Sequence, residues 1–239
     1  RLFEFKKEIM AFDYIDIAKM AINLVKDNQS VHDEISNNLD EILIDEYQDT
    51  SDIQETFIQL ISNNNCYMVG DIKQSIYRFR NANPYIFKNK YEKYALNDGG
   101  IKIDLTFNFR SRKEVLENIN LIFSNLMTNS LGDADYSKDH IMHYGLKAYE
   151  DLLQDTSFDM EFLNYEMPDN FSAMEVEAFI CASEIKKLIA NKVRIFKDNK
   201  FKEISYNDIA VLIDKSKSFA TFKKIFEYVG IPLNIEADL

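Results

Sequence analysis

Tryptophan is absent from this 239-residue chain, and the residues that often break regular structure are scarce, with six glycines and three prolines. No apolar run approaches the roughly 20 residues of a membrane-spanning helix, and no signal-peptide pattern occurs at the start. The two cysteines, Cys66 and Cys181, lie far apart in apolar settings, which argues against a disulfide framework. With 46% hydrophobic residues, the sequence predicts a globular, cytoplasmic protein that does not associate with a membrane.

A phosphate-binding loop of the form Gly-x-x-x-x-Gly-Lys-Ser/Thr is also missing, because none of the six glycines precedes a lysine. The backbone N–H groups of such a loop cradle the phosphates of a bound nucleotide. Any nucleotide site in this chain therefore lacks its main phosphate cradle.

Basic residues are outnumbered overall, and the formal net charge is −12. This argues against general coating of a nucleic acid. Residues 66–113 differ, because ten basic residues there face four acidic ones and give a formal charge of +6. This segment is a candidate surface for a polyanion, although on charge alone a solvated helix over residues 88–93 explains part of it equally well.

A short apolar run, Ile42–Ile44, is followed directly by Asp45 and Glu46. The absence of alternation predicts a parallel strand buried on both faces, which delivers the two carboxylates to its carboxyl end. The first carboxylate of such a Walker-B arrangement holds Mg²⁺ through water, and the second orients or deprotonates an attacking water. Alone this pattern is weak, because strands often end in acidic residues for solubility.

Two more apolar runs end in polar segments. Residues 67–69 precede the sequence GDIKQSIYRFR, and residues 101–105 precede the sequence TFNFRS. A helix from Thr50 or Ser51 to about Ile61 would join the first two runs as a parallel β-α-β unit. A capping box, Ser111-x-x-Glu114, predicts the start of another helix.

The remaining elements follow from periodicity and breaks. Helices are expected at residues 2–10, 13–25, 31–39, 83–96, 111–126, 172–188 and 218–229, strands at 158–165 and 209–213, and a hairpin over 194–204 that turns at Asp198-Asn199. The clearest break, Asn97-Asp98-Gly99-Gly100, predicts a domain boundary. Residues 130–157 are polar with little periodicity, as in functional or mobile loops.

The order and spacing of DEYQDT, GDIKQSIYRFR and NFRS resemble motifs II, III and IV of superfamily-1 DNA helicases of the UvrD/PcrA/Rep/RecB group. The segments VGDIKQSIYRFR, NPYIF, NFRSRKEVL and GDADYSKDHIMHYG resemble most the helicase/nucleases of the AddA type. The resemblance implies an α/β fold of the P-loop NTPase (RecA-like) type, with parallel sheets and flanking helices. Residues 1–38 would end a first accessory insertion, residues 39–98 would complete a first RecA-like domain, and residues 99–239 would begin a second, stopping before a second accessory domain.

The resemblance also implies roles at a nucleotide site. Asp45 would hold Mg²⁺ through water, Glu46 would be the catalytic base, and Gln74 would contact the γ-phosphate or the attacking water. Arg110 would act as an arginine finger on ATP and Phe109 would pack near the adenine. The alternatives are that Gln74 stabilises its loop, that Arg110 caps a helix or pairs with an acid, and that Phe109 is a core aromatic.

For DNA, the resemblance makes Tyr77 and Phe79 the aromatics on which single-stranded bases stack, and Arg80 a contact to the backbone. Related helicases often have tryptophan in place of Phe79. The alternative is that Tyr77 and Phe79 form the buried face of a strand. Gln48 and Asp49 are expected to link the Asp45 strand to the segment that begins at Gly70.

The function implied is that of the middle portion of an ATP- and Mg²⁺-dependent 3′-to-5′ DNA helicase or translocase of the AddA type. It would act in double-strand break processing and recombination repair on single- and double-stranded DNA, with a nuclease domain elsewhere and an AddB-like partner subunit. This chain alone would be inactive, because the phosphate loop is absent. A UvrD/PcrA-type repair helicase without nuclease, and a non-catalytic single-stranded DNA-binding or scaffold module, are the alternatives. His140-x-x-His143 has a metal-like spacing, but no third ligand accompanies it.

Overall fold

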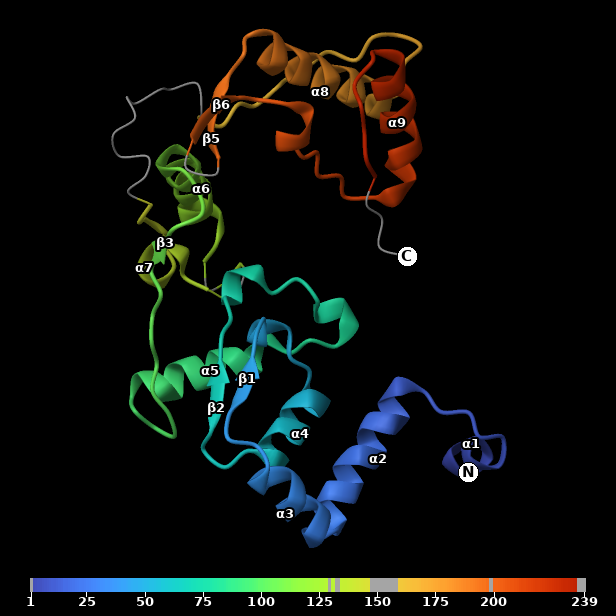
Figure 1. The fold of residues 1–239 in the computed structure, drawn as a ribbon, viewed down its shortest axis with the longest axis vertical. Coiled ribbons are helices and arrows are strands. Elements are labelled where there is room, and N and C mark those ends of the chain that lie inside the picture. The colour runs from blue at the N-terminus through green and yellow to red at the C-terminus, as the bar shows by residue number, and fades with distance from the viewer. Residues whose placement is uncertain (1, 129, 132–133, 147–158, 198–199, 236–239) are drawn as a thin grey trace. The chain divides into compact units, whose positions relative to one another are not determined.

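The computed structural model describes residues 2–128, 130–131, 134–146, 159–197 and 200–235 (Figure 1). The described residues fall into two compact units, one up to Leu146 and the other from Asp159 onward. Within the described ranges, no helix is both long enough and apolar enough to cross a membrane.

The first unit contains the predicted β-α-β unit. Strands β1 (Ile42–Ile44) and β2 (Cys66–Met68) pair in parallel, and α4 (Asp52–Ile61) connects them. Ser51 begins α4 with a capping box, since its hydroxyl accepts from the backbone N–H of Gln54 and the Gln54 side chain accepts from the backbone N–H of Ser51 at 2.9 Å. The predicted parallel pairing and the predicted cap are confirmed.

Helices precede and follow this small sheet in the chain, largely as the periodicity predicts. Helices α1 (Leu2–Glu8), α2 (Tyr14–Asp27) and α3 (Gln29–Asn37) precede β1, and α2 packs against α3 and α4. After β2, α5 (Pro84–Ala95) begins at the Asn83 cap and packs against a 3₁₀ turn at Tyr47–Asp49. Helix α5 therefore lies beside the turn that follows the carboxyl end of β1, and α2 covers part of α4.

The expectation that these strands are buried on both faces is wrong for the described structure. Burial alternates along β1, with Ile42 and Ile44 half-buried and Leu43 70% exposed. Strand β2 repeats the pattern, since Tyr67 is exposed between half-buried neighbours. One set of side chains on each strand thus has no covering element among the residues that the structure describes.

A second parallel pair lies later in the first unit, where β3 (Phe107–Asn108) pairs with β4 (His143–Tyr144). Helix α6 (Lys113–Leu126) and the short α7 (Tyr136–Asp139) lie between them in the chain. The strand predicted at 101–105 is not formed, and the pairing starts at Phe107. The Ser111 cap is also not formed, because Arg112 is the cap residue of α6.

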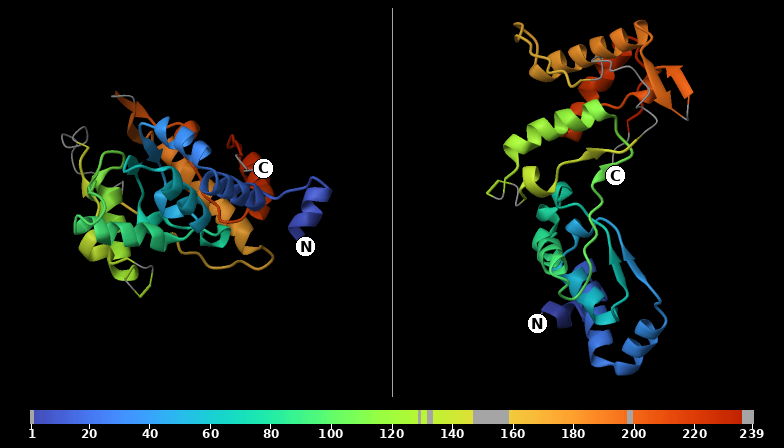
Figure 2. Two further views of the ribbon diagram at one scale, coloured as in Figure 1. Left: turned by 90° about the horizontal axis from the view of Figure 1, so that it is seen from below. Right: turned by 90° about the vertical axis from the view of Figure 1, so that its left-hand side faces the viewer.

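The second unit is built around α8 (Ala173–Ala190) and α9 (Phe219–Tyr228), which pack against each other. The predicted capping box of Ser172 and Glu175 begins α8. Figure 2 shows the antiparallel pair β5 (Arg194–Lys197) and β6 (Lys200–Glu203) at one end of α8, as predicted; the expected turn residues Asp198 and Asn199 lie outside the described residues. The core of this unit consists of Ala178, Ala182, Ile185, Phe222, Ile225, Phe226 and Ile231.

Two strands predicted for the second unit are not formed. Residues 209–213 show the alternating burial of a strand with one covered face, because Ile209, Val211 and Ile213 pack on the core while Leu212 is exposed. No described segment pairs with them, so they form no sheet. Residues 159–165 are likewise unpaired.

The predicted boundary at residues 97–100 lies inside the first unit. The assignment of residues 39–98 and 99–239 to two RecA-like domains stays a prediction. Much of the polar stretch 130–157 lies outside the described residues, although α7 and β4 fall within it.

Phe226→Ala is expected to lower the free energy of unfolding by about 3–5 kcal/mol, because it leaves a cavity in the core of the second unit. Phe226 is 1% exposed, whereas Phe162 is 75% exposed and provides a matched control. Urea unfolding followed by circular dichroism measures both variants. Phe162→Ala should stay within about 0.5 kcal/mol of wild type, and an equally small effect of Phe226→Ala would contradict the packing of α9 on α8.

Candidate functional site

Asp45 and Glu46 lie at the carboxyl end of β1, and both are exposed. The Asp45 carboxylate accepts a hydrogen bond from the backbone N–H of Glu46 at 2.9 Å. Glu46 has a left-handed backbone with φ of 50°, which costs a non-glycine residue about 1–2 kcal/mol. The two neighbouring carboxylates have different partners, since that of Glu46 accepts from the Gln48 side chain.

Gln48 connects this turn to the segment that follows β2. Its side-chain amide donates to Glu46 Oε2 at 2.6 Å, and its side-chain oxygen accepts from the backbone N–H of Asp71 at 2.9 Å. Gln48 is 1% exposed. The expected link between the two motifs is thus present for Gln48, while Asp49 contributes at most a long 3.5 Å contact to the Gln48 amide.

Gly70 makes room for this link. A Cβ atom at residue 70 would lie 2.7 Å from Gln48 Oε1 and 2.9 Å from the ring of Phe87. Both contacts are shorter than carbon atoms tolerate, and the Phe87 ring belongs to α5. The small residue after β2 is therefore required for the Gln48 side chain to reach Asp71.

Asp71 organises the 3₁₀ turn at Ile72–Gln74. Its carboxylate accepts from the Lys73 ammonium at 2.8 Å and from the Gln74 amide at 3.1 Å. Burial tends to raise the pKa of Asp71, but the hydrogen bond and charge of Lys73 outweigh it and hold the pKa below its usual value. Gln74 is exposed, with its amide turned to Asp71, which agrees with the loop-stabilising alternative.

A buried ionic cluster behind the turn was not predicted from the sequence. The Tyr47 hydroxyl donates to Glu55 of α4, and the Lys90 ammonium of α5 lies 2.9 Å from the other Glu55 oxygen and 5.0 Å from the centre of the Tyr47 ring. Gln59 also donates to Glu55, at 2.7 Å. Charged residues of an amphipathic helix usually face solvent. The only feature of the sequence that could have indicated a buried Glu55 is its position among apolar neighbours.

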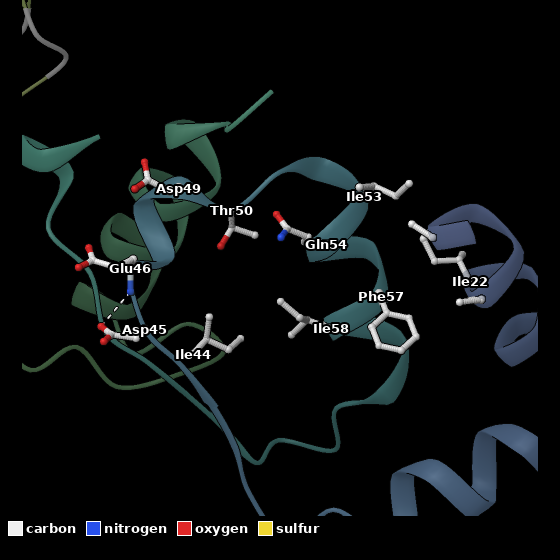
Figure 3. Close-up of a pocket in the computed structure, with 12 residues that line it drawn as sticks. Ile22, Ile44, Asp45, Glu46, Asp49, Thr50, Ile53, Gln54, Phe57 and Ile58 are labelled. Atoms are coloured by element: carbon white, nitrogen blue, oxygen red, sulfur yellow. Dashed lines mark hydrogen bonds between the residues drawn. The ribbon is translucent and has the colours of Figure 1, made fainter. Parts of the chain in front are cut away.

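A cavity of about 540 Å³ opens beside the two carboxylates. Figure 3 shows Asp45, Glu46 and Asp49 together at one end and Ile22 and Phe57 toward the other. The wall comes from α2, α4 and the end of β1, and none of the described residues that line it is basic. The cavity by itself therefore attracts no phosphate.

Tyr77, Phe79 and Arg80 form an exposed aromatic platform. The two rings lie 5.9 Å apart, and the Arg80 guanidinium is 5.3 Å from the Tyr77 ring and 5.7 Å from the Phe79 ring. Phe79 is 76% exposed. The alternative of a buried strand face is excluded, because residues 78–80 form a 3₁₀ turn and both rings are open to solvent.

Phe109 and Arg110 follow β3, and both are exposed. The Asn108 side chain fixes their turn by accepting from the backbone N–H of Arg110 at 2.9 Å and of Ser111 at 2.8 Å. The Phe109 ring lies against Gly145, where a Cβ would stand 2.8 Å from the ring. No described residue forms an ion pair with the Arg110 guanidinium, and Phe109 is not a core residue.

The structure thus joins some of the predicted site residues and not others. Hydrogen bonds through Gln48 and Asp71 connect Glu46 with Gln74, and the aromatic platform follows three residues later in the chain. Within the described part of the chain, no hydrogen bond, ion pair or ring contact joins Phe109 or Arg110 to this network.

The donor set fits a magnesium nucleotide only in part. An exposed Asp45 carboxylate offers the hard oxygen ligand that Mg²⁺ prefers, and the remaining ligands would be water and phosphate. Glu46 and Asp45 repel phosphate unless such a cation lies between them. In the described ranges, no group of three His, Cys, Asp or Glu residues could hold a metal ion.

The ring of His140 lies 6.4 Å from the ring of Tyr91, which belongs to α5. His140 thus contacts an aromatic residue. Burial lowers the pKa of His140, and the nearby Lys73 charge lowers it further.

The comparisons with known proteins agree with the motif pattern. Residues 1–95 match the UvrD/REP helicase N-terminal domain. The chain is 38% identical over 96% of its length to the A subunit of the ATP-dependent helicase/nuclease of Listeria monocytogenes, and 33% identical over 98% of its length to that of Staphylococcus haemolyticus. The corresponding protein of Alkaliphilus oremlandii is 35% identical over 95% of the chain. In each case the chain spans 20% of the relative.

Glu55→Ala is expected to lower the free energy of unfolding by about 3–5 kcal/mol, because it leaves the Lys90 ammonium and the Tyr47 hydroxyl without their shared partner. Lys90→Ala should also destabilise, and the double variant should lose less than the sum of the single losses. Urea unfolding measures the cycle, with Lys93→Ala on the exposed side of α5 as control. Strict additivity would contradict the cluster.

Proposed function

We infer that this chain, which resembles the A subunits of ATP-dependent helicase/nucleases along nearly all its length, is the middle portion of an ATP-dependent DNA helicase or translocase. One observation carries the proposal: the buried Gln48 side chain connects the carboxylate proposed to act on water, Glu46, to the segment that presents exposed aromatic rings. A motor needs such a mechanical link between its nucleotide and its DNA.

The proposed chemistry assigns Asp45 to Mg²⁺ and Glu46 to the attacking water of ATP hydrolysis. A bound Mg²⁺ would neutralise phosphate charge beside these two acids. Gln74 can release Asp71 and turn its amide toward a γ-phosphate or water, since the residue is exposed and its amide offers both a donor and an acceptor. Arg110 is proposed as the arginine finger and Phe109 as the adenine contact, reached when the β3 turn and the β1 turn close on a nucleotide.

The proposed DNA contact is the platform of Tyr77, Phe79 and Arg80. Exposed rings with a guanidinium beside them suit unpaired bases, because every base has a flat face and the phosphate backbone follows the positive charge. Double-stranded DNA would be engaged by parts of a longer protein.

The RecA-like architecture is part of the proposal. Leu43 and Tyr67 are exposed on strands of the kind that such folds bury, and the relatives are about five times as long as this chain. We propose that further strands and helices of a longer protein cover these side chains and supply the phosphate loop. That protein would act with an AddB-like partner and a nuclease domain, move 3′ to 5′, and process double-strand breaks for recombination repair in the cytoplasm.

A narrower function is a single-stranded DNA-binding module without catalysis. The missing phosphate loop and the exposed platform favour it for the isolated chain. Both proposals use the same DNA contact. They differ in ATP hydrolysis, which only the helicase carries out.

Tyr77→Ala is expected to weaken binding of an oligothymidine by the purified chain about 5- to 150-fold, which corresponds to about 1–3 kcal/mol for one stacked base. Fluorescence anisotropy with a labelled oligothymidine of about 20 nucleotides, long enough to cover a typical single-strand site, measures the dissociation constant. Tyr14→Ala, which removes an exposed tyrosine from α2, is the matched control and should bind as wild type does. Equal affinities of the Tyr77 variant and wild type would contradict the platform.

The purified chain is expected to show no ATP hydrolysis stimulated by DNA, because two carboxylates cannot replace the phosphate loop. A coupled phosphate-release assay with and without oligothymidine measures this. Stimulated hydrolysis that disappears in Glu46→Gln would overturn the prediction and show that the chain completes an active site by itself. Hydrolysis that persists in Glu46→Gln would point to a contaminating ATPase.

A further inference from the structure

Tyr85, in the first turn of α5, is an exposed aromatic residue outside the aromatic platform. Its side chain is 48% exposed, and the guanidinium of Arg78 lies 5.3 Å from the centre of its ring. Arg78 begins the same 3₁₀ turn that Arg80 ends, and the Arg80 guanidinium lies beside the platform rings of Tyr77 and Phe79. Three exposed rings therefore border a single turn of three residues.

The backbone connects Tyr85 closely to the platform. The backbone N–H of Ala82 donates to the carbonyl oxygen of Tyr77 at 3.3 Å, and Ala82 is buried. Two residues, Asn83 and Pro84, separate Ala82 from Tyr85 in the chain, so the Cα atoms of Ala82 and Tyr85 lie no more than about 11 Å apart. The contact of the Arg78 guanidinium with the Tyr85 ring shows that this ring also lies beside the 3₁₀ turn.

The start of α5 fixes the backbone of Tyr85. The side-chain oxygen of Asn83 accepts from the backbone N–H of Tyr85 at 3.2 Å, and the Asn83 amide donates to Asp52 of α4 at 2.8 Å. The backbone N–H of Asn83 donates to the carbonyl oxygen of Thr50 at 2.9 Å. Pro84 is buried at the first helical position, where its ring fixes φ. A ring on such a fixed backbone loses little conformational freedom when a ligand stacks on it.

We propose that Tyr85 stacks a base of single-stranded DNA, beside the bases that stack on the aromatic platform. Every base has a flat face, and a single-stranded DNA site covers several nucleotides, whereas the platform supplies two rings. Stacking on Tyr85 needs the exposed ring and does not depend on the charge of Arg78. The proposal rests on the proposed action on DNA and adds one residue to that contact.

The first test measures binding of a labelled oligothymidine by the whole chain with fluorescence anisotropy. Tyr85→Ala should weaken binding about 5- to 150-fold, as expected for the loss of one stacked base. Tyr85→Phe restores the ring without the hydroxyl and should restore the affinity. Tyr14→Ala removes an exposed tyrosine from the first turn of α2 and is the matched control. Circular dichroism melting checks that each variant folds.

Two further readouts separate stacking from a structural effect on the 3₁₀ turn. Stacking neutralises no phosphate, so Tyr85→Ala should leave the slope of log affinity against log salt unchanged, whereas Arg80→Ala should lower it by about 0.7 for a lost phosphate contact. An oligonucleotide of the same length without bases should bind Tyr85→Ala and wild type equally. A loss of affinity for this abasic strand as large as that for oligothymidine would overturn the proposal.

Tyr85→Trp gives an independent reading that keeps an aromatic ring at this position. Because the chain contains no tryptophan, the emission of this variant reports on residue 85 alone. Saturating oligothymidine should quench the emission through stacking, and the abasic strand should not. Tyr14→Trp is the matched control and should show no quenching. Unchanged emission of Tyr85→Trp with saturating oligothymidine would contradict the stacking of a base on residue 85.

The two DNA contacts can fail independently. Wild-type affinity of Tyr85→Ala together with weakened binding by Tyr77→Ala would overturn the proposal for Tyr85 and leave the platform in place. The reverse result would support Tyr85 and contradict the platform.

Discussion

The side chain of Gln48 sets the geometry on which the rest of the candidate site depends. Its amide and its carbonyl oxygen are used at the same time, by Glu46 on one side and by the backbone of Asp71 on the other. A buried amide that loses one of these partners costs about 1–3 kcal/mol. The turn at Glu46 and the segment that begins at Gly70 are therefore expected to move together. The hydrogen bond from Gln48 to Glu46 also holds the left-handed turn at Glu46 in place.

Local signals in the sequence predicted the helices better than the strands. Ser51, Asn83 and Ser172 begin helices because their side chains satisfy free backbone N–H groups, a requirement that depends only on neighbouring residues. Strands depend on distant partners. Residues 209–213 have the composition and the alternating burial of a strand, but no described segment offers them hydrogen bonds, and an apolar run does not reveal how many of its faces will be covered.

The candidate site shows the same division. Asp45 and Glu46 could be found because they directly follow an apolar run, and Tyr77 and Phe79 could be found because their segment resembles a helicase motif. The cluster of Glu55, Lys90 and Tyr47 could not, since an acid on α4 and a base on α5 become partners only when both helices pack against the turn after β1. Its physical effect reaches the site nevertheless, because Tyr47 lies between Glu46 and Gln48 in the chain.

Net charge is a poor guide to what this chain binds. At physiological salt, charges more than roughly 8–10 Å apart hardly interact in solvent, so a phosphate responds to the few side chains within that distance. Residues 66–113 carry a formal charge of +6, although the whole chain carries −12. The acidic remainder still acts on encounter at low salt, where it slows the approach of any polyanion. Binding of a polyanion to a chain of this composition would therefore depend on the local arrangement of charges and not on the net charge.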